Sequence, residues 1–165
     1  CQLADKAQLE RAAGIGMCIN FFSNHLYYWG DAHATQTVGP EWAARMNPAE
    51  TARQLGITFS LHCDAPITPL NPLFTAWCAA HRASASGKIL GEAERLSVAD
   101  ALNAVTLGAA KTLKLEHLIG SIEPGKFADF AVLEDDPSAV AAERLKDIPV
   151  WGTVLAGREF PAPQQ

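Results

Sequence analysis

Two short apolar runs stand out along the chain, and each follows a segment with helical spacing. Residues 15–22 and 57–61 are nearly continuous in apolar and β-branched residues, which is typical of strands that are buried on both faces. In the segments that precede them, 5–13 and 48–55, the pattern favours helices, and a glycine follows each one as a stop signal. The first third of the chain therefore predicts two helix–strand units.

Capping residues mark where the helices begin. Asn47 precedes a proline and a glutamate in the positions of a capping box, and Asn71 again precedes a proline. The second proline opens a predicted helix over 72–85, and a box that begins at Ser97 opens another over 98–111. Helices that alternate with continuous apolar strands favour an α/β fold, in which a parallel sheet is covered by helices.

The last third of the chain changes character. Pro-Gly turn chemistry at 120–126 separates it from the helices, and the pattern beyond predicts mainly β structure. Ala156-Gly157 lies between two apolar runs and predicts a β-hairpin. The expected elements are a strand at 129–133, a short helix within 136–147, hairpin strands at 150–155 and 158–160, and a frayed tail at 161–165.

Composition and charge narrow the function classes. The 165 residues are 48% hydrophobic and 19% charged, with a net charge of −5 and no basic stripe, so nucleic acid is not an expected partner. No apolar run approaches the roughly 18 residues that span a bilayer, and a membrane partner is not expected either. The four cysteines lack CxxC spacing. We therefore expect free, buried thiols and a cytoplasmic protein.

The candidate chemistry follows the two strands. His25, Asp31 and His33 lie in a predicted loop after the first strand, whereas His62 and Asp64 end the second. The carboxyl ends of parallel strands meet at one edge of a sheet, where sites form. Because strand side chains alternate, His62 and Asp64 point to the same side and could bind a divalent metal or pass a proton. Alternatively, Asp64 caps a turn and His62 bonds to it.

Aromatic residues at 27–29 extend the first of these loops. Tyr28 and Trp29 could line a substrate pocket, or the run could be a hydrophobic plug beneath the loop. Both interpretations remain open from the sequence.

Four segments resemble those of one enzyme family. The turn and strand at the C-terminal side, the helical segment before them and the end of the second strand are similar to motifs of the amidohydrolase superfamily. The end of the second strand taken together with residues 71–73, and the segment after the first strand, resemble its N-substituted formamide deformylase-like branch. The segments are 120–133, 97–110, 61–66 with 71–73, and 22–33.

The resemblance implies a metal-dependent hydrolase that cleaves a C–N bond, amide- or formamide-like, in a small-molecule substrate. It implies that residues 1–112 are the last part of a (β/α)8 TIM barrel and that 113–165 supply strands of a small β-sandwich. Asp64 falls on the position of a metal ligand, usually to zinc, and general base. His25, together with Tyr28, Trp29 and His62, is expected to contact substrate. A cyclic amide hydrolase or base deaminase of the same superfamily is the alternative.

Other ligands of the family have no counterpart in this sequence. The paired histidines of the first strand and those of the fifth and sixth strands cannot be placed, and residues 1–3 resemble the end of the sixth-strand motif. We expect about the C-terminal third of an enzyme, with little or no metal bound by this chain alone. Self-association, or pairing with the missing N-terminal part, is expected. The alternative from a different functional class is that the chain is a non-catalytic fragment, or a subunit that needs a partner chain.

Overall fold

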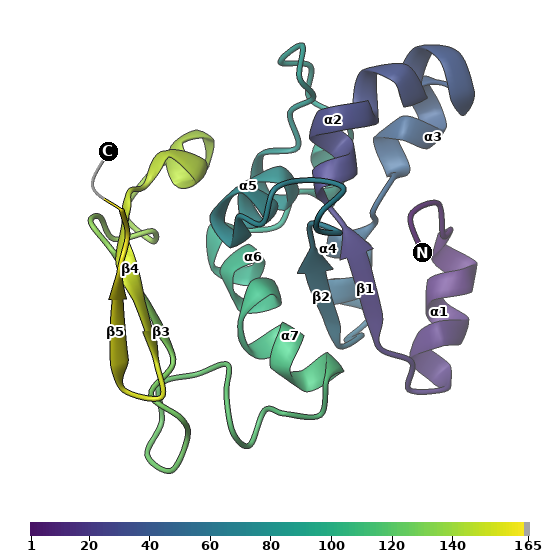
Figure 1. Ribbon diagram of the computed structural model, residues 1–165. Coiled ribbons are helices and arrows are strands. Elements are labelled where there is room, and N and C mark those ends of the chain that lie inside the picture. The colour runs from purple at the N-terminus through teal and green to yellow at the C-terminus, as the bar shows by residue number, and fades with distance from the viewer. Residues whose placement is uncertain (164–165) are drawn as a thin grey trace.

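The computed structural model describes residues 1–163, and its centre is a pair of parallel strands (Figure 1). Strand β1 (Ile19–Phe22) pairs in parallel with β2 (Phe59–His62), with Ile19 opposite Phe59 and Phe22 opposite His62. The predicted parallel α/β arrangement is thus confirmed for these strands.

Helices flank this pair. Helix α1 lies beside β1, whereas α6 and α7 lie on the side of β2 (Figure 1). The core between them is filled by aliphatic and aromatic side chains, among them Phe21, Leu61, Ala76, Trp77 and Ala101. The helices are α1 (Lys6–Gly14), α4 (Ala49–Gln54), α5 (Pro72–His81), α6 (Val98–Val105) and α7 (Leu107–Thr112).

The first apolar run is only partly a strand. Strand β1 begins at Ile19, because residues 15–17 bond back to the last turn of α1. Ile19 and Phe21 are buried, but Asn20 between them is exposed. The prediction of a strand buried on both faces is therefore wrong for β1, and Asn20 instead lines a cavity beyond the strand end.

Backbone conformation shortens or divides the predicted helices. Helix α5 ends at His81 because Arg82 adopts a left-handed conformation with φ +58°. The predicted helix 98–111 is two helices, since Thr106 leaves the helical region and its hydroxyl donates to the Leu102 carbonyl. The predicted Asn47 cap is wrong: Asn47 has φ +49° and its side-chain amide nitrogen donates to the Phe22 carbonyl, which leaves Pro48 at the N-cap.

The largest correction concerns residues 23–33. This predicted loop is helix α2 (Asn24–Ala32), which continues into a π-helix, η1 (His33–Thr37), and is followed by α3 (Pro40–Arg45). The segment contains no proline between 23 and 39, so its backbone can bond continuously. Aromatic residues four apart then stack along one helix face.

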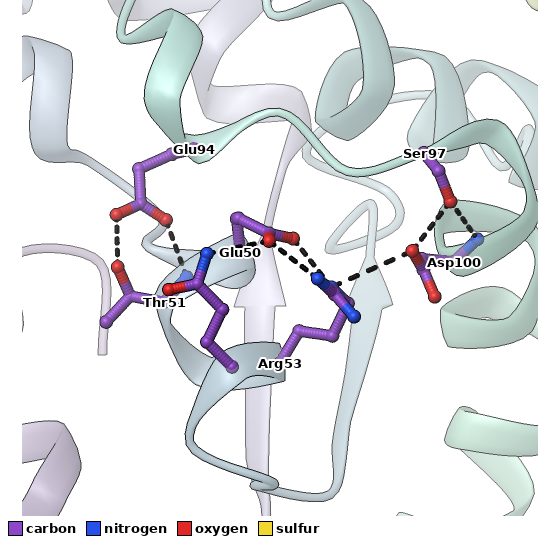
Figure 2. Close-up of polar contacts among 7 residues, drawn as sticks. Glu50, Thr51, Arg53, Glu94, Ser97 and Asp100 are labelled. Atoms are coloured by element: carbon purple, nitrogen blue, oxygen red, sulfur yellow. Dashed lines mark hydrogen bonds and ion pairs between the residues drawn. The ribbon is translucent and has the colours of Figure 1, made fainter.

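A polar network joins α4 to the chain before α6 (Figure 2). Glu94, in the 3₁₀ turn η2 (Glu92–Glu94), accepts hydrogen bonds from the Thr51 amide and hydroxyl. Glu50 binds Arg53 at 2.7 Å instead of completing a capping box. The predicted Ser97 cap is confirmed by a 3.0 Å bond from the Asp100 amide.

The C-terminal segment forms a separate antiparallel sheet (Figure 1). Its strands are β3 (Phe130–Leu133), β4 (Val150–Leu155) and β5 (Arg158–Pro161), in that spatial order. The hairpin at Ala156-Gly157 is confirmed, and both residues have positive φ, as such turns require. Pro161 ends β5 and so is not part of a tail, while residues 164–165 of that predicted tail lie outside the described residues.

A short helix packs between this sheet and the α/β part of the fold. The 3₁₀ helix η3 (Ala142–Asp147) packs on α5, where Leu145 is fully buried and the Trp77 indole donates to the Glu143 carbonyl at 3.0 Å. The short helix predicted within 136–147 is confirmed.

All four cysteines are free thiols. Cys63 and Cys78 are buried as predicted, but Cys1 and Cys18 are exposed. Among the helices described, none has the length and apolar character needed to cross a membrane.

Candidate functional site

The candidate site lies where β1 and β2 end. The last residues of the two strands, Phe22 and His62, are cross-strand neighbours, and their rings stack with centroids 5.1 Å apart. Helix α2 leaves from the end of β1, and Asp64 follows two residues after His62. The structure thus brings both predicted groups of side chains to one edge of the strand pair.

Helix α2 presents a row of rings on one face. His25, Trp29 and His33 are spaced by four residues, so they follow one another along the helix. The His25 ring lies 4.6 Å from Trp29, 5.2 Å from His33 and 4.7 Å from Phe22, measured between centroids. The spacing of four is visible in the sequence, but it indicates a shared face only in a helix, and the segment was predicted to be a loop.

His25 is held by hydrogen bonds as well as by stacking. The amide nitrogen of Gln2 lies 2.9 Å from His25 Nδ1, and His33 Nε2 lies 3.1 Å from the same atom. His33 Nδ1 in turn lies 2.8 Å from the Thr37 hydroxyl. Sequence reasoning missed both ends of this chain of contacts: Thr37 was signalled by its spacing of four from His33, whereas Gln2 carried no local signal.

The surroundings of His25 and His62 disfavour the charged form of each ring. Burial lowers the pKa of His25, and repulsion from His33 and His62 lowers it further, although Asp64 opposes this effect. Burial also lowers the pKa of His62, again against Asp64. The Asp64 carboxylate therefore lies near enough to influence both rings.

The turn after β2 exposes Asp64. Since β2 ends at His62 and Asp64 has φ +55°, Asp64 is not part of the strand, and the predicted strand alternation that would point His62 and Asp64 to the same side is wrong. The turn is closed by the backbone, through the Ile67 amide and the Asp64 carbonyl at 2.7 Å, and by the Thr68 hydroxyl, which donates to the Cys63 carbonyl. Thr68 also accepts from buried Asn24, which ties this turn to the start of α2. The hydrogen bonds that close the turn therefore do not use the Asp64 carboxylate.

Asp64 and His62 line a shared cavity. Its volume is about 370 Å³, and its wall also includes Asn20, Leu70 and Thr75. An exposed carboxylate beside an imidazole and apolar surface can accept a proton from a ligand bound in the cavity.

The aromatic run divides between the site and the core. Trp29 lies against His25 and Phe22. Tyr28 is 42% exposed and packs between Trp29 and Phe74 of α5, while Tyr27 packs on Trp77. Trp29 is thus within the predicted site, Tyr28 borders it, and Tyr27 belongs to the core.

Asp31 has a structural position. Its carboxylate accepts from the hydroxyls of Ser84 and Ser86 at 2.8 and 2.7 Å and from the Ser86 amide. These hydrogen bonds lower the pKa of Asp31. Asp31 therefore anchors α2 to the segment after α5.

A complete metal site is not formed by the described residues. Within residues 1–163, no group of three or more His, Cys, Asp or Glu side chains is arranged to hold a metal ion. Asp64 and nearby imidazoles are suitable donor types, but protein zinc sites use three or four protein ligands.

Comparison with protein families and characterised sequences identifies similar proteins. Residues 1–160 match the sequence model described as amidohydrolase family. The chain is 26% identical over 155 residues to N-substituted formamide deformylase of Arthrobacter pascens, covering 94% of the chain and 29% of that protein. It is 29% identical over 160 residues to the putative amidohydrolase YtcJ of Bacillus subtilis, covering 95% and 30%. The chain thus spans less than a third of the length of these relatives.

Solved structures share the fold. An uncharacterized metal-dependent hydrolase from Pyrococcus horikoshii superposes with a TM-score of 0.72 at 23% identity, over 86% of this chain and 29% of that one. An adenosine deaminase from Xanthomonas campestris, solved with bound zinc, superposes with a TM-score of 0.68 at 21% identity, over 96% and 35%. At these identities the likeness concerns the fold.

Proposed function

The chain belongs to the amidohydrolase family, and on that premise we propose that it is the part of a longer, metal-dependent C–N hydrolase that supplies the general base and part of the substrate pocket. The observation that carries the proposal is the position of Asp64. Its carboxylate follows β2, lines the cavity together with His62, and acts electrostatically on His25 and His62, whose pKa values are lowered chiefly by burial.

Asp64 is the proposed base. Its carboxylate oxygen accepts a proton from the attacking water and afterwards gives that proton to the leaving nitrogen of an amide or formamide. The sequence places no other acidic residue within ten positions of the end of either central strand except Asp31, which is bound by two serines. Asp64 is therefore the carboxylate best placed for this proton transfer.

The neighbouring rings are proposed to hold the substrate. Neutral His25 can donate a hydrogen bond to a carbonyl oxygen, and Trp29 with Phe22 offers apolar ring surface. His62 is stacked on Phe22 and shares the cavity wall with Asp64. Tyr28, at the border, is proposed to contact the more distant part of a substrate.

Substrate turnover tests this function. We expect the complete gene product to hydrolyse N-substituted formamides or simple amides, measured by release of the amine. A cyclic amide hydrolase or base deaminase would instead open a cyclic amide or release ammonia from a nucleobase. If none of these substrates reacts in the presence of zinc or other divalent metals, the proposed function is wrong.

The metal is proposed to need ligands from outside this chain. Asp64 alone matches an expected ligand, and the described residues do not form a metal site by themselves. We expect the 165-residue chain to retain little or no zinc after gel filtration, as measured by inductively coupled plasma analysis. One zinc retained per chain would contradict this and would mean that His25, His33 or His62 completes a site.

The missing strands are also proposed to come from elsewhere. We propose that residues 1–112 are the last part of a (β/α)8 barrel and that 113–165 are a segment of a β-sandwich. In the described chain β1 and β2 pair only with each other, and unpaired strand edges attract partners.

Self-association of the isolated chain is the expected consequence. Light scattering should give a mass above 17.7 kDa that increases with concentration. Addition of the N-terminal remainder of the gene product should reduce this association. A monomer at all concentrations would contradict the proposal.

A further inference from the structure

The hydrogen bonds around His25 run in a single direction. The amide nitrogen of Gln2 can only donate, so His25 Nδ1, 2.9 Å away, must accept. His33 Nε2 lies 3.1 Å from the same His25 atom; because Nδ1 has a single lone pair, a donating His33 shares that lone pair with Gln2 in a longer, bifurcated hydrogen bond. In neutral His33 this leaves Nδ1 as an acceptor, and the Thr37 hydroxyl lies 2.8 Å from it. Each group thus favours one proton position on the next.

Local structure holds the outer end of this chain of contacts. His33 and Thr37 are the first and last residues of the π-helix η1, a form that occurs mostly as single turns and often at functional sites. The Thr37 hydroxyl is also 3.5 Å from the His33 carbonyl, but the contact to the ring nitrogen is much shorter. The turn therefore places a hydroxyl donor against His33.

At the other end of this series of hydrogen bonds, the donor to His25 comes from a residue distant in sequence. Gln2 precedes α1 and reaches His25 across 23 positions of sequence. The Gln2 backbone carbonyl also accepts a hydrogen bond from the Asn47 backbone amide at 2.8 Å. This bond helps to fix the position of Gln2, so its side chain approaches His25 from a held backbone.

We propose that Gln2, His33 and Thr37 are positioning residues that hold neutral His25 as the tautomer with its proton on Nε2, so that His25 donates to the carbonyl oxygen of the substrate. The proposal rests on the proposed function for the role of the donated hydrogen bond. The tautomer itself follows from the contacts alone. A donor aimed at an oxygen that gains negative charge stabilises the transition state.

Packing restricts ring reorientation. Phe22 meets the His25 ring edge-on, Trp29 covers it at 4.6 Å, and His33 stacks beside it. A ring flip of His25 would take Nδ1 away from both donors while still confined by these neighbours. The stacked rings and the hydrogen bonds therefore select the same orientation.

The test reads the tautomer directly by nuclear magnetic resonance. Long-range proton–nitrogen correlation spectra of the ¹⁵N-histidine-labelled chain, recorded at pH 8 without substrate, distinguish protonated from unprotonated ring nitrogens. We expect His25 and His33 both with the proton on Nε2. In Gln2→Glu, a carboxylate that only accepts faces His25 Nδ1, and we expect the His25 proton to move to Nδ1.

Two further variants make the result specific. Gln36→Glu adds the same charge at an exposed position of η1 and should leave the His25 tautomer unchanged. Thr37→Val removes the hydroxyl and should give a mixture of tautomers at His33. The backbone spectrum of each variant shows whether it is folded, and Thr37→Val serves if Gln2→Glu is not.

The outcomes separate this proposal from the proposed function. His25 with its proton on Nδ1 in the unaltered chain, or a tautomer that does not respond to Gln2→Glu in a folded variant, overturns the positioning role. In the complete gene product, Gln2→Glu should lower kcat by about 10–100-fold with a smaller change in KM, as for other residues that orient a functional histidine. The expected tautomers in a protein without hydrolase activity would refute the proposed function but support the arrangement.

Discussion

In the complete gene product, Asp64→Asn is expected to lower kcat for C–N bond hydrolysis by about 10²–10⁴-fold, which is the usual loss when a general base is removed. Asparagine has nearly the same shape, but its amide cannot take the proton of the attacking water. The turn should persist, because it is closed by the Asp64 carbonyl and by Thr68 and not by the side chain.

A matched substitution controls for the loss of charge. Asp135 is an exposed aspartate after β3, so Asp135→Asn should leave kcat unchanged. Metal content is measured in both variants, because Asp64 is also a proposed metal ligand. Near-normal turnover in Asp64→Asn with metal retained would show that another group is the base, and His62 would be tested next.

The parallel strands and the hairpin could be predicted because their signals are local. Continuous apolar residues predicted β2 over 57–61, and the structure has Phe59–His62. Positive φ at Ala156 and Gly157 is what a tight hairpin turn requires. Such signals are contained within a few residues, and no distant contact overrides them.

Helix α2 was missed because its residues have mixed signals. Ser, Asn, Gly and Asp among the aromatic residues of 23–33 favour a loop. In the structure the buried Ser23 hydroxyl instead donates to the Thr75 carbonyl and the buried Asn24 amide nitrogen donates to the Thr68 hydroxyl, which holds both residues at the helix start, although the Asn24 side-chain oxygen has no partner among the described residues. The choice between loop and helix was thus made by long-range contacts that the local pattern does not contain.

The location of the candidate site could be predicted, but not its internal order. Strand ends placed His25, His62 and Asp64 at one edge. The partner of His25, in contrast, is Gln2, which belongs to a segment before the first helix. Only the packed fold brings the two together, so no sequence spacing could indicate this contact.

Nothing in the sequence pattern singles out Arg82, since it falls inside the predicted helix 72–85. It is 1% exposed, and burial lowers its pKa to about 10, so the guanidinium remains charged at neutral pH. Its nitrogens donate to the carbonyls of Leu90 at 2.6 Å, Met46 at 2.8 Å and Asn47 at 3.2 Å. Arg82 therefore joins the chain after α3 to the segment after α5.

Replacement of Arg82 should be the most destabilising single change in this part of the fold. In Arg82→Met the stem is kept but buried carbonyls lose their donors, and each unpaired buried group costs about 1–3 kcal/mol. We expect the free energy of unfolding to fall by about 3–5 kcal/mol, seen as a lower urea midpoint at unchanged slope.

Two further variants show which property of Arg82 accounts for the loss of stability. Arg82→Lys keeps the charge, but one ammonium group cannot reach carbonyls on both segments, so its urea midpoint should lie between those of Arg82→Met and the unaltered chain. Arg53→Met removes an exposed guanidinium that pairs with Glu50 and should leave the midpoint nearly unchanged. If Arg82→Met were as stable as the unaltered chain, water would have to replace the guanidinium, and Arg82 would not be what holds the two segments together.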